Sequence, residues 1–573
     1  VVNSAEPILE QVERMLKDPD GIDPDLWEKK ATELQVLRMR LNSARALAET
    51  LVLYPDARFG LGIESSMKKV LIKDVPFDGW FANHYDLSLA RYEREGFQIV
   101  IIPFDKSLKN VTVKATDLVK AGQLEPRATV QAKVSLVGHI RVEHRTPYEK
   151  EVHDWWPDPL LDFQQSCDVN VEDQVAFWIT VSTQSDTAAG DYLGQITVSA
   201  DECPPLALNL KAHVWDFELP LLTSLRNAFT FDVHAMRKFY REKKDQEIVR
   251  KYHDFLLDYR LNIDHLYRKD PEDIEVLKYG AKRGMNAFNI CFTNGPERVK
   301  TIDEFVPQLK EAGLYDYAYV YGFDEVKKEK FPEIKQTFGE IHKRHPGLET
   351  MTTADDKTFG KQSGLRDYVD IWVPLTWTYD LEEARQLRAE GKEMWWYICV
   401  NPFHPYANWF IEYPAIESRL LTGSMSYMSE TGGFLYYLIN LWGNNKECIQ
   451  SGPYTTWDGA CLEYRPGTLW ANGDGSLMCP GPDGPLSTIR LENIRDGFED
   501  YDYFKTLVAL RDKALRSEQS DAVKAFIKQA DEALAVPVSL VKSLTEFTYD
   551  PTEVYSHRQK IAEAIVAGRA LGQ

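Results

Sequence analysis

The chain has 573 residues, a formal net charge of -21 at pH 7 and an aromatic content of 12%. This length exceeds what one hydrophobic core usually supports, so we expect at least two domains. The excess of negative charge argues against a nucleic-acid backbone or an anionic membrane surface as partner, and favours a neutral or weakly charged ligand. The sequence has no apolar run of 18 residues or more, so no transmembrane segment is predicted.

The seven cysteines are scattered and form no C-x-x-C, which predicts free or buried thiols and neither a disulfide scaffold nor a structural zinc site. Residue 1 is Val, with no secretory hydrophobic region before it. We therefore expect an exported protein (periplasmic, cell-surface or secreted) whose signal peptide has been removed, with a cytoplasmic location as the alternative. The sequence leaves the oligomeric state open.

The first third of the chain divides into a helical and a β-type part. Residues 5–17 and 24–52 carry apolar residues at helical spacing without an internal glycine, which predicts an N-terminal helical segment over residues 1–55. Short β-type runs such as "EGFQIVIIPF" and "VAFWITVST" then follow without helices between them. They predict a β-sandwich over residues 56–217, ended by a proline-containing linker at 216–227.

After the linker, candidate strands alternate with amphipathic helix patterns. The strands are residues 226–232, 262–268, 287–293, 316–325, 348–355, 369–377, 393–401 and 433–442. Eight such units predict a (β/α)8 TIM-type barrel over residues 218–510, and no G-x-G-x-x-G follows the first strand to indicate a doubly wound fold. Residues 511–573 predict C-terminal helices packed on the barrel. The expected class is thus α/β plus all-β.

The fourth candidate strand ends in two adjacent carboxylates. In "YAYVYGFDEVKKE" (318–330) an aromatic strand runs directly into Asp324 and Glu325. The structural alternative is a helix cap followed by an acidic first turn. However, the active sites of such barrels lie where the strands end, and no loop intervenes here, so we expect at least one carboxyl to face the barrel mouth.

Two carboxyl groups are what glycoside hydrolysis usually requires, one as acid and one as nucleophile or base. Barrel glycosidases commonly place the nucleophile at the end of strand 7. Here that region, "WYICVNPFHPYANWF", offers Asn401 and His404 but no Asp or Glu before Glu412. We therefore predict substrate assistance, in which the 2-acetamido group of the sugar is the nucleophile. Glu325 then protonates the leaving group, and Asp324 orients the acetamido N–H and stabilises the oxazolinium.

The segments "GFDE" (322–325) and "GDGSLMCPGPDGPLSTIRLENIRDGFEDYDYF" (473–504) resemble glycoside hydrolase family 123. The resemblance covers about residues 60–510. It implies an exo-acting, retaining β-N-acetylgalactosaminidase with a β-sandwich before a (β/α)8 barrel. It also implies Asp324 as acetamido stabiliser and Glu325 as acid/base. No metal or organic cofactor is expected, and the partner would be a carbohydrate with terminal β-linked GalNAc, as in glycosphingolipid-type oligosaccharides.

Other side chains at predicted strand ends are candidates for the sugar pocket, where aromatic rings stack on sugars and amides bond hydroxyls. They are His265, Asn289, Trp377, Tyr379, Tyr397, Asn401 and Trp442. For each of them, core packing is the competing interpretation.

Three further groups of polar residues are not predicted to bind the sugar. His234 and His404 lack metal-ligand spacing and predict loop histidines rather than a metal site. Asp355 and Asp356 are the remaining nucleophile candidates. The acidic run at 492–502, beside Arg490 and Arg495, predicts a solvated helix face with ion pairs.

Two alternative functions stay open at this stage. One is a β-N-acetylglucosaminidase of similar mechanism, since the two substrates differ only at the 4-hydroxyl. The other is a catalytically silent glycan-binding protein, against which the intact Asp-Glu pair argues.

Overall fold

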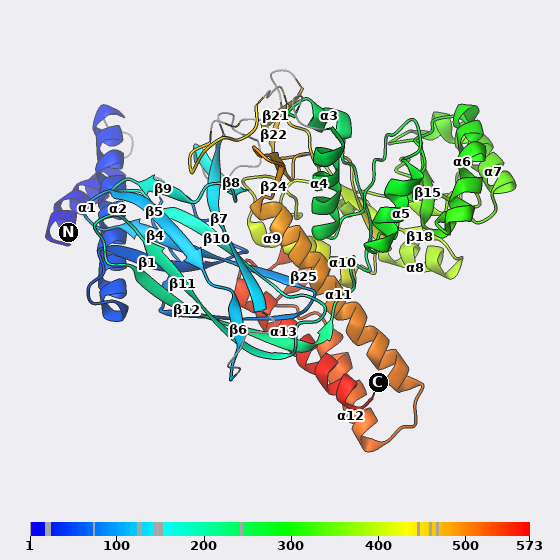
Figure 1. Cartoon of the computed structure of the whole chain (residues 1–573). Helices are drawn as coiled ribbons and strands as arrows, with labels where there is room; N and C mark the ends of the chain where they lie inside the picture. The colour runs from blue at the N-terminus through cyan, green and yellow to red at the C-terminus, as the bar shows by residue number, and fades with distance from the viewer. Residues whose placement is uncertain are drawn as a thin grey trace. The chain divides into compact units, whose positions relative to one another are not determined.

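The computed structural model describes residues 2–17, 24–72, 75–122, 129–142, 146, 153–240, 245–443, 447–455, 457, 461–465 and 469–572 (Figure 1). Residues 1 and 18–23 of the predicted N-terminal segment lie outside this part. The chain forms two compact units. The first comprises Val1–Glu143, Val152–Asp216 and Gln450–Thr456, and the second comprises His144–Glu151, Phe217–Ile449 and Trp457–Gln573.

The first unit is rich in β-structure. Twelve strands form one sheet, in the order β2-β1-β4-β10-β7-β6-β11-β12-β3 with β5, β8 and β9 attached at its side. Pairing is antiparallel between β1 and β4, β4 and β10, β10 and β7, and β11 and β12. The strands are β1 (Phe59–Ser65), β2 (Trp80–Phe81), β3 (His84–Arg91), β4 (Arg94–Pro103), β5 (Leu108–Ala115), β6 (Leu118–Lys120), β7 (Thr129–Arg141), β8 (Trp155–Leu161), β9 (Ser166–Val169), β10 (Val175–Ser182), β11 (Gly190–Ser199) and β12 (Leu206–Glu218).

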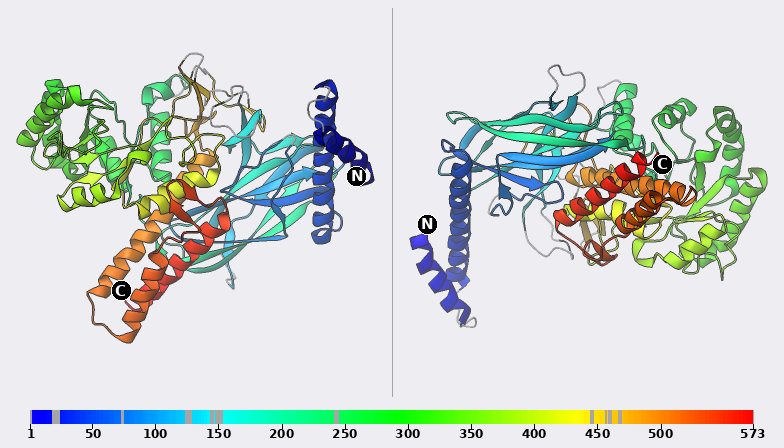
Figure 2. Two further views of the ribbon diagram at one scale, coloured as in Figure 1. Left: turned by 180° about the vertical axis from the view of Figure 1, so that it is seen from behind. Right: turned by 90° about the horizontal axis from the view of Figure 1, so that it is seen from below.

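Two helices accompany this sheet, as the N-terminal periodicity predicts. They are α1 (Val2–Lys17) and α2 (Pro24–Leu53), and α2 contacts β1, β2 and β4 (Figure 2). Arg45 of α2 donates to the carbonyls of Phe77 and Gly79 at 3.1 and 2.7 Å. Thr50 accepts the N–H of Leu61 at 3.3 Å, so both apolar packing and hydrogen bonds fix α2 to the sheet.

The second unit is mixed α/β, and its short strands pair in parallel. One sheet has the order β14-β15-β16-β17-β18 and another the order β13-β20-β19. Isolated parallel bridges join Thr230 to Asp264 and Leu375 to Tyr397. The strands are β13 (Arg226–Phe229), β14 (Phe288–Asn289), β15 (Ala318–Tyr321), β16 (Glu349–Thr352), β17 (Ile371–Trp372), β18 (Glu393–Met394), β19 (Trp396–Ile398) and β20 (Gly433–Tyr436).

Helices alternate with these strands and complete the unit. They are α3 (Val233–Arg237), α4 (Asp245–Asp258), α5 (Ile274–Lys282), α6 (Val299–Ala312), α7 (Phe331–Arg344), α8 (Leu381–Ala389), α9 (Ala415–Leu420), the π-helical turn η6 (Leu421–Met425) and α10 (Ser426–Met428). The unit ends with β21 (Cys461–Arg465), β22 (Leu469–Asn472), β23 (Cys479–Pro480), β24 (Pro485–Leu486), α11 (Ile489–Leu515), α12 (Asp521–Leu534), β25 (Val541–Ser543), β26 (Glu546–Phe547) and α13 (Pro551–Ala570).

The second predicted strand, 262–268, is present only as the bridge at Asp264. Side-chain amides take the place of ladder hydrogen bonds there. Asn227 accepts the N–H of Asn262 at 3.0 Å, and the Asn262 amide donates to the Asn227 carbonyl at 2.8 Å. The segment therefore keeps its place beside β13 without a regular strand backbone.

Strand β15 explains why the sequence before Asp324 is apolar on both faces. Tyr319 and Tyr321 belong to a core cluster with Met351 and Ile371 of the neighbouring strands. Val320, on the opposite face, belongs to a second cluster formed with side chains of α6 and α7. Because successive side chains of a strand point to opposite faces, β15 is buried on both sides.

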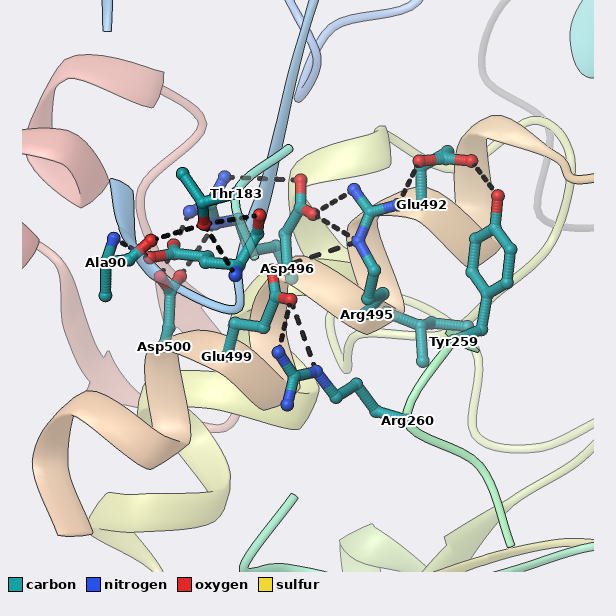
Figure 3. Close-up of polar contacts among 12 residues, drawn as sticks. Ala90, Thr183, Tyr259, Arg260, Glu492, Arg495, Asp496, Glu499 and Asp500 are labelled. Carbon is teal, nitrogen blue, oxygen red and sulfur yellow. Dashed lines mark hydrogen bonds and ion pairs between the residues drawn. The ribbon is translucent and has the colours of Figure 1, made fainter. Parts of the chain in front are cut away.

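The acidic run at 492–502 is not the solvated helix face that the sequence predicts. Every residue of α11 from Ile489 to Phe504 is buried. Arg495 pairs with Glu492 and Asp496, each at 2.5 Å, and Arg260 pairs with Glu499 at 2.9 Å (Figure 3). Buried charges persist when they are paired in this way, whereas an unpaired buried charge is strongly destabilising.

Helix α11 also approaches its neighbours too closely for a side chain at one position. A Cβ atom on Gly497 would lie 2.1 Å from Thr422 Oγ1 and 2.4 Å from the Arg419 carbonyl. The helix contacts α12 and α13, which it joins in a C-terminal group (Figures 1 and 2). Since α11 ends at Leu515, the predicted boundary at residue 510 falls inside one continuous helix.

Among the described residues, no helix combines the length and apolar character that crossing a membrane requires. The cysteines with described side chains (Cys167, Cys203, Cys291, Cys399, Cys448 and Cys479) are all free thiols.

Candidate active site

The turn after β15 places Asp324 and Glu325 in a tight, strained backbone. Gly322 allows this turn, because a Cβ atom there would lie 2.3 Å from the Thr293 carbonyl. Phe323 and Glu325 both have positive φ, at 55° and 49°. Non-glycine residues rarely adopt this left-handed region, and such strain clusters at functional sites.

Two hydroxyl groups hold the Asp324 carboxylate. Tyr321 donates to Asp324 Oδ1 at 2.5 Å, and Thr353 donates to the same oxygen at 2.9 Å. Tyr321 is fully buried, Thr353 is 8% exposed, and Asp324 itself is half-buried. Hydrogen bonds to an ionised acceptor are short and strong, so this carboxylate has a fixed orientation.

A different side chain holds Glu325. Tyr397, at the centre of β19, donates to Glu325 Oε1 at 2.6 Å, and the backbone N–H of Glu325 donates to Thr353 Oγ1 at 2.9 Å. Burial raises the pKa of Tyr397, and the hydrogen bond to Glu325 raises it further. The tyrosine therefore remains a donor, while Glu325 keeps an exposed side chain that a substrate can reach.

A further tyrosine, Tyr267, lies beside both carboxylates. Burial raises its pKa, and the charges of Asp324 and Glu325 raise it further. Its ring meets the Tyr321 ring edge-on, with centroids 6.0 Å apart. Neutral tyrosines therefore surround the acidic pair, which is how hydroxyl donors are presented to an oxygen-rich ligand.

Of the predicted sugar-pocket residues, Tyr397 lies at the carboxylates. The His265 ring accepts the Tyr267 N–H at Nδ1, 3.0 Å away. His265 is half-buried. Burial lowers the pKa of its ring to about 4, and the positive charge of Arg268 contributes less to this shift, so the ring is neutral at pH 7. Asn401 is half-buried after β19. Trp377 is 52% exposed and presents its ring to solvent.

The other three predicted pocket residues have internal partners. The Asn289 side chain donates to the Leu266 carbonyl at 2.7 Å and accepts the Tyr321 N–H at 2.9 Å. Trp442 is 3% exposed and donates to the Met478 carbonyl at 2.7 Å. Tyr379 donates to the Ser429 carbonyl at 2.9 Å. These contacts are of the kind expected for core packing.

Sequence reasoning missed Tyr267, Tyr321, Thr353 and Asp474. Asp474 is 2% exposed and accepts hydrogen bonds from the hydroxyls of Tyr436 and Tyr437 at 3.0 and 3.1 Å. The negative charges of Asp474 and Glu325 both act on the Cys399 thiol. Burial is the main cause that raises the pKa of this thiol to about 12, and the charge of Asp474 is the second. The position of Thr353 near the end of the predicted strand at 348–355 is the one signal that the sequence offers for this residue.

The remaining nucleophile and histidine candidates lie in other surroundings. Asp356 accepts bonds from Thr358 and Ser363 within its own loop, and Asp355 is exposed. His404 stacks on Tyr413 at 3.6 Å and pairs with Glu417 at 2.8 Å. His234 is exposed, as predicted, but it lies on the short helix α3 and not in a loop.

Residues 226–507 match the model described as "Glycoside hydrolase 123, catalytic domain". No curated protein matches the chain. Among solved structures, the chain is similar to a family 123 glycoside hydrolase from Clostridium perfringens, with a TM-score of 0.66 and 14% identity over 90% of this chain and 99% of that one. At this identity the likeness shows the fold alone. It extends over nearly the whole chain, including the β-rich first unit.

A family 39 glycoside hydrolase from Bacteroides cellulosilyticus covers 68% of this chain and 80% of its own, at 12% identity, but its TM-score of 0.31 carries no argument. The match over residues 226–507 contains the Asp324-Glu325 turn, its tyrosines and the buried α11 segment. The protein is therefore a glycoside hydrolase, and its residues 226–507 are a catalytic domain of glycoside hydrolase family 123.

Proposed function

We propose that the protein is a retaining exo-β-N-acetylgalactosaminidase that works by substrate assistance. One observation carries the proposal: Asp324 and Glu325 are adjacent in the chain, yet each carboxylate is held by its own donors. Two neighbouring carboxylates with separate supports suit two separate roles in one reaction. A family 123 enzyme whose structure was analysed for glycolipid glycan hydrolysis shares this fold, which supports a glycan substrate.

The proposed architecture is a (β/α)8 barrel preceded by a β-sandwich. In support, parallel pairings run from β14 to β18 and from β19 through β20 to β13, and Thr230 bridges to the segment at Asp264. Tyr321 is the last residue of β15, the carboxylates follow it, and Tyr397 lies in the short strand β19. Catalytic groups of such barrels gather at the carboxyl ends of the strands.

In the first step, Glu325 gives its proton to the glycosidic oxygen while the acetamido oxygen attacks C1. The bond between C1 and the glycosidic oxygen breaks, the aglycone leaves as an alcohol, and an oxazolinium ion forms. Asp324 accepts a hydrogen bond from the acetamido N–H, and its negative charge stabilises the cation as it develops.

In the second step, the Glu325 carboxylate takes a proton from water as the water oxygen attacks C1. The oxazolinium ring opens and restores the acetamido group, and Glu325 is again protonated. Two displacements at C1 leave its configuration retained. The hydrogen bond from Tyr397 to Glu325 Oε1 fixes the side chain through both proton transfers.

The test is hydrolysis of aryl β-glycosides of GalNAc, GlcNAc and galactose, together with inhibition by the thiazoline that mimics the oxazoline. Cleavage of the GalNAc substrate alone, with tight thiazoline inhibition, is the expected result. Preferred cleavage of the GlcNAc substrate would assign the other 4-hydroxyl configuration. Cleavage of the galactoside, which has no acetamido group, would contradict substrate assistance.

A further inference from the structure

Among the described residues, Thr353 is the one side chain hydrogen-bonded to both members of the carboxylate pair. It is the first residue after β16, the strand that pairs with β15, and it is 8% exposed. Its hydroxyl oxygen lies 2.9 Å from Asp324 Oδ1 and 2.9 Å from the backbone nitrogen of Glu325. The same oxygen lies 3.1 Å from the Tyr321 hydroxyl.

The number of protons available fixes the direction of these bonds. The Glu325 nitrogen can only donate, so Thr353 accepts there, and an ionised Asp324 can only accept, so Thr353 donates to it. Tyr321 also donates to Asp324 Oδ1. Both hydroxyl protons thus point at Oδ1, and we assign Oδ2 to the acetamido N–H of the substrate.

We propose that Thr353 is a positioning residue that sets Asp324 and Glu325 together, and this inference rests on the proposed function. Its donated bond orients the Asp324 carboxylate. Its accepted bond holds the Glu325 backbone in the left-handed conformation, with φ at 49°, which that residue would otherwise leave. A single hydroxyl therefore couples the acetamido stabiliser to the acid/base group.

The test compares Thr353→Val, which removes the hydroxyl at nearly constant volume, with Thr353→Ser, which keeps it. The matched control is Thr350→Val on the same strand. Thr350 is fully buried, and its hydroxyl bonds to the Tyr368 carbonyl and to Asp370, at 2.9 Å each, on the side away from the carboxylates.

We expect Thr353→Val to lower kcat about 10- to 100-fold with KM changed by less than about 3-fold, since a lost bond to a charged group has this size. The loss should be larger for an aryl GalNAc substrate with a poor leaving group than for an activated one. This ratio of kcat/KM values does not depend on the amount of folded enzyme, so a merely structural role would not change it. Thr353→Ser should recover most of the activity, and Thr350→Val should leave the ratio unchanged.

Hydrogen exchange of the full-length enzyme without substrate tests the positioning separately from turnover. In Thr353→Val, the peptide that contains the Glu325 amide should exchange about 5-fold faster or more, because the amide loses its acceptor. The same peptide in Thr350→Val should exchange as in the wild type. Faster exchange in an enzyme that cleaves none of the glycosides would refute the proposed function and keep the positioning role. Unchanged exchange, or an unchanged leaving-group ratio in an active enzyme, would overturn the inference.

Discussion

At the scale of single residues, different side chains hold the carboxylates of Asp324 and Glu325. We therefore expect substitutions of the two residues to have different effects on catalysis. Tyr397 bonds to Glu325 and not to Asp324, while Tyr321 bonds to Asp324. Replacing one carboxylate by its amide therefore leaves the other in place. The two variants can then be distinguished by how their losses depend on the leaving group.

Glu325→Gln should lower kcat/KM about 10²- to 10⁴-fold on GalNAc substrates with poor leaving groups, because protonation is lost, and less on activated aryl glycosides. Asp324→Asn should slow oxazoline formation whatever the leaving group. Measuring kcat/KM for a series of aryl GalNAc substrates checks both variants. A leaving-group-dependent loss in Asp324→Asn would mean that the two roles are exchanged.

At the scale of elements, α11 combines a buried helix with ionisable groups. Burial raises the pKa of Asp502 to about 6, from its ordinary value of about 4, against the opposing charge of Arg260. The folded state thus binds the proton more tightly than the unfolded state does. The stability that this proton contributes is present below about pH 4 and is lost as the pH rises through about 6.

Asp502→Asn should remove this pH dependence, since the amide oxygen can still accept the Ser224 N–H that now bonds at 2.7 Å. The variant should gain up to about 3 kcal/mol in free energy of unfolding relative to the wild type between pH 4 and pH 7. Urea unfolding at several pH values measures the difference. Asp512→Asn, on the same helix with a side chain 40% exposed, is the control and should show a smaller change.

Helix α7 carries a buried hydroxyl that packing does not satisfy. Thr337 is fully buried, and its Oγ1 has no hydrogen-bond partner among the described residues. Thr337→Val should therefore stabilise the protein by about 1 kcal/mol, which a thermal or urea unfolding experiment would show. The comparison is Thr422→Val, in which the lost hydroxyl donates to the Ser418 carbonyl at 3.0 Å. That variant should be destabilised, and equal effects of the two would contradict the argument.

At the scale of the whole molecule, the division into units does not follow chain order. Gln450–Thr456 belongs to the first unit although the residues on either side belong to the second. Within the first unit, Gly452 donates its N–H to Gln164 at 2.7 Å, and Thr455 donates to the His139 carbonyl at 3.0 Å. These bonds join the segment to β7 and to the turn after β8.

Gln164→Ala should therefore raise the exchange rate of the Gly452 amide about 5-fold or more in the full-length protein, because that amide loses its acceptor. Hydrogen exchange with mass spectrometry measures it. Gln165→Ala is the matched control, since the Gln165 side chain donates only to the Asp162 carbonyl at 3.1 Å. Equal protection of Gly452 in the wild type and in Gln164→Ala would contradict the role of this contact.

The sequence was sufficient to locate the helices, the β-rich region and most of the parallel strands, because these follow from local periodicity. It also located Asp324 and Glu325, since an apolar strand that ends in two charges is visible along the chain. It was wrong about residues 492–502, because charge alone suggests solvent. One partner that allows burial, Arg260 for Glu499, is 239 residues away in the chain.

By itself, then, the sequence indicated the family, the two kinds of secondary structure and the carboxylate pair that we propose as catalytic. Only the tertiary structure decided which side chains support that pair. Thr353, Tyr397 and Tyr267 reach the two carboxylates from three other segments, and nothing in their local sequence separates them from core residues. Local propensity acts between near neighbours in the chain, whereas the geometry of a site depends on contacts between distant segments, which form only when the chain folds.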